Sequence, residues 1–241
     1  MHDEIPDDEP EEPLPYAPPP LPPDTGWTIT GALEFGWTTL TSNPIVIVAV
    51  IVGTVPGVLL GGVRGVLVSL TERARGAEAA LLGAGIGFVG LLELVVGVYF
   101  AMVLTRYFID TARGRSPDVG SLFTGGPYLS AFAASLIQMV AVLLGICALV
   151  VPGVILALGL SQTQALVVDG RLGPWDAIKR SWEITQGWKL RILGLWLVSI
   201  LVALVGVMAC VVGLVPAAAI IYAANAYTYL HIVGERPVRQ R

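Results

Sequence analysis

The sequence contains a run of 39 residues, from residue 130 to residue 168, without a charged side chain. A straight α-helix of that length would measure about 58 Å, because each residue adds about 1.5 Å. The hydrocarbon core of a bilayer is only about 30 Å thick, so one crossing cannot accommodate the run. Pro152 and Gly153 supply a turn signal within it. The run therefore predicts two antiparallel membrane-spanning helices joined by a tight turn near these residues.

Three further apolar stretches, residues 44–70, 77–104 and 188–233, flank this run. The last again exceeds the thickness of a bilayer and carries its turn signal near Pro216. The composition agrees, since 55% of the residues are hydrophobic and 13% are charged, whereas ordinary soluble domains contain about 25% charged residues. We expect an all-α, polytopic membrane protein with six transmembrane helices, arranged as three hairpins that each follow a cytoplasmic interfacial segment.

The segment 173–188 is amphipathic when it is placed on a helical wheel at about 100° per residue. Tryptophans gather on one side and charged residues on the other. An amphipathic helix of this kind between membrane spans is expected to lie in the bilayer interface. Residues 27–43 match it when the two segments are aligned on tryptophan, and residues 118–124 give a weaker third match. The predicted interfacial anchors are Trp37, Trp175, Trp182 and Trp188.

Basic residues accompany these tryptophans. Near an anionic membrane surface each basic residue adds about 1 kcal/mol of attraction. The alternative interpretation is the ordinary excess of basic residues in cytoplasmic loops, which requires no specific lipid. The candidate contacts with lipid headgroups are Lys179, Arg180, Lys189 and Arg191.

The distribution of basic residues also predicts the orientation of the chain. With the N-terminus in the cytoplasm, eleven of the 14 Lys and Arg residues lie on the cytoplasmic side and three lie outside. Both termini are therefore expected in the cytoplasm. Residues 1–24, with eight acids and nine prolines, are expected to form a disordered tail, either a solvated leader or a docking site for a protein partner. The membrane domain is expected over residues 25–234, followed by a basic cytoplasmic tail over residues 235–241.

Polar side chains are expected within the spans. Glu93 is the only acid near the middle of a predicted span, and a carboxylate that faces lipid would cost at least about 2.5–3.5 kcal/mol. We therefore expect Glu93 to face the interior and to contact Gln138, Asn225 or another polar side chain. The polar residues either line a path for a small molecule or form hydrogen bonds between helices. The candidate intramembrane cluster comprises Glu93, Gln138, Ser161, Gln162 and Asn225, with Gln164 in the same run.

An internal repeat is indicated by two of these residues. Ser161 lies nine residues after Pro152, and Asn225 lies nine residues after Pro216. Internal duplication is common in membrane proteins, transporters among them, so the repeat alone assigns no function.

Three stretches, residues 150–157, 165–170 and 177–187, combine a Pro-Gly turn, an apolar segment and a Ser-Trp-Glu helix. This pattern resembles the membrane domain of the glycerophosphoryl diester phosphodiesterase family and related uncharacterised bacterial six-helix membrane proteins. The resemblance covers residues 130–200 well and the rest of the chain only in layout. In the phosphodiesterases the chemistry belongs to a separate soluble domain. The resemblance thus implies a membrane module without the enzyme, located in a bacterial plasma membrane.

The predicted spans contain no paired carboxylates, no Ser–His pair and no set of metal ligands. We therefore expect no enzymatic activity, no cofactor, no metal and no nucleic-acid partner. The predicted function is that of an integral membrane protein that organises membrane lipids or a partner protein. The alternative is a small-molecule transporter or permease with a polar path near Glu93.

Overall fold

The computed structural model describes residues 26–115, 117, 120, 126–170, 172–209 and 213–238. The predicted tail and most of the weak third interfacial segment lie outside these residues. In the described part the elements are all α-helices. They are α1 (Ile29–Ser42), α2 (Ile45–Thr71), α3 (Ala77–Ala112), α4 (Tyr128–Ala148), α5 (Val150–Gly159), α6 (Thr163–Gly170), α7 (Pro174–Ile184), α8 (Lys189–Met208) and α9 (Leu214–Val233).

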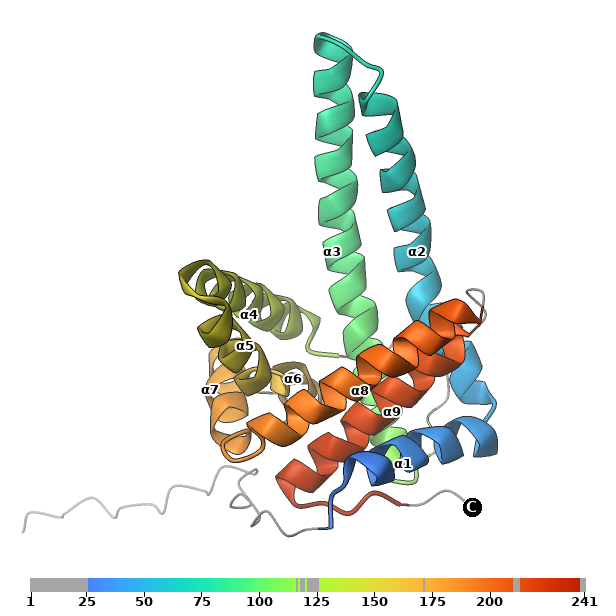
Figure 1. Cartoon of the computed structure of the whole chain (residues 1–241), viewed down its shortest axis with the longest axis vertical. Helices are drawn as coiled ribbons and strands as arrows, with labels where there is room; N and C mark the ends of the chain where they lie inside the picture. Colours follow the sequence, from blue (N-terminus) through green and yellow to red (C-terminus); the bar gives the residue numbers. More distant parts are fainter. Residues whose placement is uncertain are drawn as a thin grey trace, which may run out of the picture.

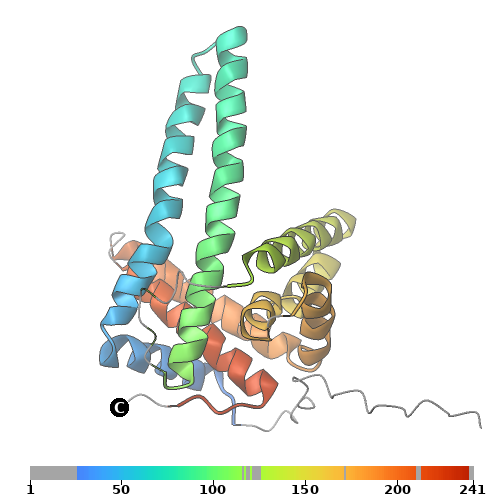
Figure 2. The ribbon, with the colours of Figure 1, turned by 180° about the vertical axis from the view of Figure 1, so that it is seen from behind.

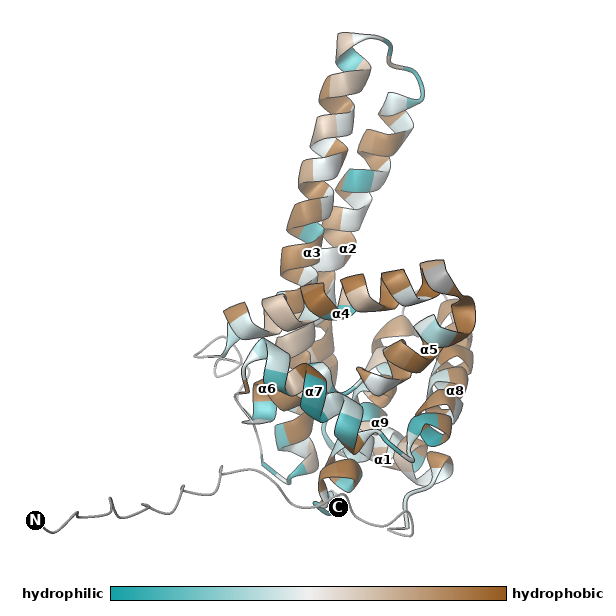
Figure 3. Ribbon diagram, turned by 90° about the vertical axis from the view of Figure 1, so that its left-hand side faces the viewer, coloured by the Kyte–Doolittle hydropathy of each residue, from teal (hydrophilic) through white to brown (hydrophobic). Residues whose placement is uncertain are grey.

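Three pairs of helices extend in different directions from a common region (Figures 1 and 2). In these pairs, which we call the arms, α2 packs along α3, α4 packs against α5, and α8 packs against α9. The common region, which we call the base, consists of α1, α6, α7 and the neighbouring ends of α3 and α9. Hydrophobic residues predominate along α2 and α3, whereas hydrophilic residues gather on α7 (Figure 3).

The expectation of an all-helical fold is confirmed for the part of the chain that the structure describes. Five segments are long and apolar enough to cross a membrane, namely α2, α3, most of α4, the combined α5–α6 segment and α8. The sixth expected crossing corresponds to α9, which is not among the five. Its 20 residues include Asn225, Tyr229 and His231, and these polar side chains lower its hydrophobicity.

Helix α3 extends beyond the expected end of its span at residue 104. It contains 36 residues, which correspond to a length of about 54 Å. The extension is explained by packing, because Tyr107, Phe108 and Ile109 are buried in the base. The end of α3 that lies in the base is therefore Ala112.

The turn between α4 and α5 lies slightly before the predicted position at Pro152. Leu149 is extended, with φ −166° and ψ 145°, and α5 begins at the next residue. Pro152 consequently lies in the first turn of α5, where proline removes no intrahelical hydrogen bond. Pro216 occupies the same position in α9. At Gly153 a Cβ atom would lie 2.7 Å from the backbone nitrogen of Ile146, so only glycine permits this close approach of α4 and α5.

Aromatic residues form much of the core of the base. Trp27 donates a hydrogen bond from Nε1 to Oγ1 of Thr228 at 3.1 Å. Its ring meets the ring of Trp188 edge-on, with 5.8 Å between centroids. Trp188 is 3% exposed. Trp188 is thus a core residue packed against Trp27, and it is not exposed as a lipid-facing anchor would be.

The other predicted anchors occupy different environments. Trp37 and Trp175 are 59% and 58% exposed, as lipid-facing anchors would be. Trp182 is half-buried and covers Gly159, where a Cβ atom would overlap its ring. The buried face of α7 consists of the small or aliphatic residues Ala177, Ser181 and Ile184. Trp37 and Trp182 therefore differ in burial although their sequences align.

The variant Trp182→Ala is expected to lower the thermal unfolding temperature of the protein in detergent. Truncation of a buried aromatic side chain costs about 3–5 kcal/mol in soluble cores, and half-burial places Trp182 near the lower end. Trp37→Ala is the matched control and should have little effect because Trp37 is mostly exposed. Equal shifts of the unfolding temperature in the two variants would contradict this account.

Candidate functional site

A polar cavity of about 260 Å³ lies between α3, α4, α6 and α9. It brings together four of the five residues of the predicted polar cluster, which are Gln138, Ser161, Gln162 and Asn225. Further polar lining comes from Thr105, Gln164, Tyr222 and Tyr229. Among the described residues, the cavity is lined without any Asp, Glu, Lys, Arg or His side chain. It is therefore a neutral site of amides and hydroxyls.

The cavity adjoins a break in the helical chain. α5 ends at Gly159 and α6 begins at Thr163, so residues 160–162 form a turn. Within this turn Ser161 donates a hydrogen bond from Oγ to the carbonyl oxygen of Leu158 at 2.8 Å. Non-helical backbone at membrane depth is tolerated where it is buried in protein or lines a cavity. Both conditions apply to this break.

Ser181 of α7 and Thr185, the residue that follows α7, pair with the backbone that the break exposes. The carbonyl oxygen of Gly159 accepts hydrogen bonds from Oγ of Ser181 at 2.9 Å and from Oγ1 of Thr185 at 3.0 Å. The backbone N–H of Gln162 donates to Oγ of Ser181 at 3.3 Å. Ser181 and Thr185 are both fully buried. The polar part of the buried face of α7 thus stabilises the break between α5 and α6.

The amide side chains of the cavity are only partly hydrogen-bonded. Nε2 of Gln164 donates to Ser135 at 2.7 Å, and Nδ2 of Asn225 donates to the carbonyl oxygen of Ile221 at 2.8 Å. Their amide oxygens accept no hydrogen bond within the described part of the chain, and there Gln138 forms none through its side chain. These groups remain available to water or a ligand.

Glu93 does not belong to this cavity. Its Oε2 lies 3.4 Å from Nη1 of Arg64 on α2, and the two side chains are 34% and 51% exposed. Glu93 precedes Thr105 of the cavity by twelve residues, a distance of about 18 Å along α3. Glu93 therefore contacts neither Gln138 nor Asn225, and the polar partner that was the third expectation is Arg64. The continuation of α3 to Ala112 places Glu93 away from the cavity.

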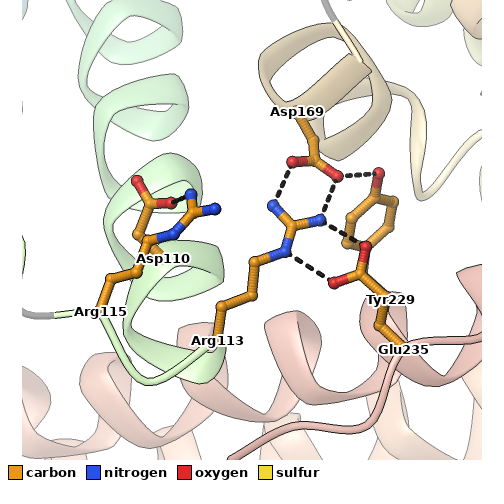
Figure 4. A network of polar contacts seen from close by, with 6 residues as sticks. All are labelled: Asp110, Arg113, Arg115, Asp169, Tyr229 and Glu235. Atoms are coloured by element: carbon orange, nitrogen blue, oxygen red, sulfur yellow. Dashed lines mark hydrogen bonds and ion pairs between the residues drawn. The ribbon is translucent and has the colours of Figure 1, made fainter. Parts of the chain in front are cut away.

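A charged network lies next to the cavity (Figure 4). Arg113 binds both carboxylate oxygens of Asp169 and both carboxylate oxygens of Glu235, the latter at 2.7 and 2.9 Å. Tyr229, which lines the cavity, donates from its hydroxyl to Oδ2 of Asp169 at 2.9 Å. The hydrogen bonds with Asp169, and less so those with Glu235, raise the pKa of Arg113 against the opposing effect of burial. The guanidinium therefore stays charged and joins α3, α6 and the C-terminal segment.

The predicted headgroup contacts lie around the corner between α7 and α8. Nζ of Lys189 lies 3.5 Å from the centroid of the Trp182 ring. Lys179 and Arg191 approach the rings of Trp175 and Trp188 at 5.6 and 5.0 Å. Arg180 pairs with Glu183 at 3.2 Å. The four basic residues are thus held by aromatic rings or by an acid of the same region.

Sequence reasoning missed several residues of this region. Thr105 and Tyr229 were not expected in the cavity, and Arg113 and Asp169 were not expected to pair. Spacing offered one signal, because Thr105 precedes Arg113 by eight residues, as Ser161 precedes Asp169. That shared spacing, together with the Ser161–Asn225 correspondence, could have identified Thr105.

Comparisons with known proteins give no relative. No family model matches the chain, and neither a curated protein nor a solved structure matches it.

Replacement of Asp169 by alanine is expected to destabilise the protein more than replacement of Glu235 by alanine. The side chains of Arg113 and Asp169 are 18% and 10% exposed, and breaking a buried pair costs about 3–5 kcal/mol. Glu235 is 40% exposed, and an exposed pair contributes about 0–1 kcal/mol. Thermal unfolding in detergent measures both, with the exposed Asp176→Ala as control. A larger loss for Glu235→Ala would overturn this ranking.

Proposed function

We propose that this protein is a non-catalytic integral membrane protein that crosses the membrane six times and binds membrane lipid between its arms. The observation that carries the proposal is that the rest of the protein buries little of the apolar surface of the arms. The most apolar stretches of α2, α3, α4 and α8 are only 11–22% buried. Apolar surface of that extent requires lipid or a partner to cover it. The amides and hydroxyls of the cavity favour binding over acid–base catalysis, which most often relies on His, Asp, Glu or Lys side chains.

The C-terminal segment supports an even number of crossings. The backbone N–H of Val238 donates to the carbonyl oxygen of Ala112 at 2.8 Å, and Glu235 binds Arg113. The C-terminal segment therefore lies at the inner end of α3. With the N-terminus in the cytoplasm, α2 and α3 return the chain to the cytoplasmic side. The base and both termini are then cytoplasmic, with α9 as the sixth crossing.

The corner between α7 and α8 is the proposed contact with lipid headgroups. Lys189 and Lys179 lie against tryptophan rings, and Trp175 is largely exposed. Tryptophan and lysine together are typical of the membrane interface. The acidic proline-rich residues 1–24 are the proposed docking site for a protein partner.

Transport of a small solute is the second candidate function. The observation that favours it is the polar cavity at the broken helix, since discontinuous helices form substrate sites in many transporters. A path through Glu93 is not supported, because Glu93 lies away from the cavity and pairs with Arg64.

Single cysteines test the proposed topology in a background without Cys147 and Cys210. Cysteines at Arg75, Val151 and Met208, all exposed near the tips of the arms, should react with an impermeant maleimide from outside intact cells. Cysteines at Gln186 and Val238 should react only after permeabilisation. Labelling of Val238→Cys from outside would instead indicate five crossings, and labelling of the three tips from different sides would refute the arrangement.

Native mass spectrometry tests lipid binding. Protein extracted in mild detergent should retain a defined anionic lipid, and Lys189→Ala with Arg191→Ala should reduce its occupancy severalfold. The matched control is Arg73→Ala with Arg75→Ala, which removes two exposed basic residues at the tip of the α2–α3 arm. Equal occupancy in both double variants would refute the headgroup site. Flux of a small neutral solute into protein-containing liposomes without retained lipid would favour transport.

A further inference from the structure

The polar cavity receives a similar contribution from three helical segments. Each supplies a polar residue and the residue four positions later. The three pairs are Thr105 with Ile109, Ser161 with Ala165, and Asn225 with Tyr229. Residues four apart share one face of a helix, so α3 and α9 each present one continuous face to the cavity, whereas Ser161 reaches it from the turn that precedes α6. Two helix faces and the break between α5 and α6 thus form the wall of the cavity.

The hydrogen-bonding groups of the cavity define the chemistry of a ligand. An amide side chain both donates and accepts hydrogen bonds. Within the described part of the chain, the side-chain amide of Gln138 neither donates nor accepts a hydrogen bond, and the amide oxygens of Gln164 and Asn225 accept none. Tyr222 also lines the cavity. A ligand that matches these groups has to donate and accept at several closely spaced positions, as neighbouring hydroxyl groups do.

Charged ligands fit the site poorly. Burial of a charge is costly unless an opposite charge or several hydrogen bonds compensate it. The residues that line the cavity in the described part of the chain include no acid and no base. The adjacent carboxylate of Asp169 is already engaged by Arg113 and Tyr229. The environment therefore selects against phosphates, carboxylates and ammonium groups.

The size of the cavity also limits the ligand. Its volume of about 260 Å³ would hold roughly eight water molecules at about 30 Å³ each. Typical drug-sized sites begin at about 300 Å³. Several lining residues, among them Gln138 and Asn225, are half-buried, so the cavity is open to entry. A group of the size of glycerol or one sugar ring fits this space.

We propose that the cavity between α3, α4, α6 and α9 binds an uncharged polyol, either as a free solute or as the headgroup of a neutral glycolipid. The inference rests on the proposed membrane location. Gln138, Ser161 and Asn225 contribute the hydrogen bonds, and the break between α5 and α6 places Ser161 at the wall. Tyr229 connects this wall to the network of Arg113.

Calorimetric titration of the full-length protein in lipid nanodiscs tests the proposal. Glucose is the free probe, monoglucosyl-diacylglycerol is the lipid probe, and glucose 6-phosphate is the charged analogue. The wild type should bind one of the two neutral probes saturably and the phosphate at least tenfold more weakly. Gln138→Leu should weaken binding by about tenfold or more, because it removes hydrogen bonds without adding charge. Gln186→Leu, at an exposed glutamine outside the cavity, should bind as the wild type does.

A second cavity variant, Asn225→Leu, separates a loss of binding from a loss of folding. The unfolding temperature without ligand shows whether each of the two variants still folds. Binding of free glucose identifies a dissolved solute, whereas binding of the glycolipid alone identifies a headgroup, and both outcomes support the proposal. Absence of saturable binding to either neutral probe, or wild-type affinity in a folded Gln138→Leu or Asn225→Leu variant, overturns it. Retention of an anionic lipid in the mass spectrometer would then leave the proposed function standing while this inference fails.

Discussion

The cost of an unpaired backbone group in apolar surroundings governs this structure. Continuous helices meet the constraint within themselves, but the chain between α5 and α6 cannot. There the carbonyl group of Gly159 and the N–H of Gln162 find partners in Ser181 and Thr185. α7 is consequently fixed against the break by the hydrogen bonds of Ser181 and of Thr185, which follows the helix. This requirement explains why the charged side of α7 and Trp175 face outward.

The interactions that join distant segments of the chain are concentrated in the base. Arg113 links three segments that are distant in the sequence through Asp169 and Glu235, whereas the most apolar stretches of the arms are largely uncovered. In the α2–α3 arm the ion pair between Arg64 and Glu93 is about half-exposed. Contacts within the protein therefore hold the base together, whereas they cover little of the apolar surface of the arms. The cavity lies between the base and the arms, and helices of all three arms contribute residues to its wall.

The sequence was sufficient to predict helices, segments apolar enough to cross a membrane, and a polar cluster of which four of the five residues line the cavity, because apolar runs and the spacing after proline are local signals. Ser161 and Asn225 could be paired from their distance to Pro152 and Pro216. The position of Glu93 could not be predicted, since the continuation of α3 to residue 112 depends on packing in the base. For the same reason the tryptophan pattern did not separate a buried core residue from an exposed anchor. Long-range pairs such as that of Arg113 leave no periodicity to detect.

The two helices that align on Trp37 and Trp182 show why equivalent positions carry different residues. α1 packs on α9, and α7 packs on α6. At Gly36 a Cβ atom would lie 2.7 Å from a carbonyl oxygen of α9, so this contact requires glycine. The aligned residue of α7 is Ser181, whose hydroxyl donates to the carbonyl of Gly159. A continuous helix such as α9 already pairs its carbonyl groups internally and needs only space. A broken helix leaves a carbonyl group without an internal partner. Serine donates the hydrogen bond to that group, whereas glycine at the same position would only allow the two helices to approach closely.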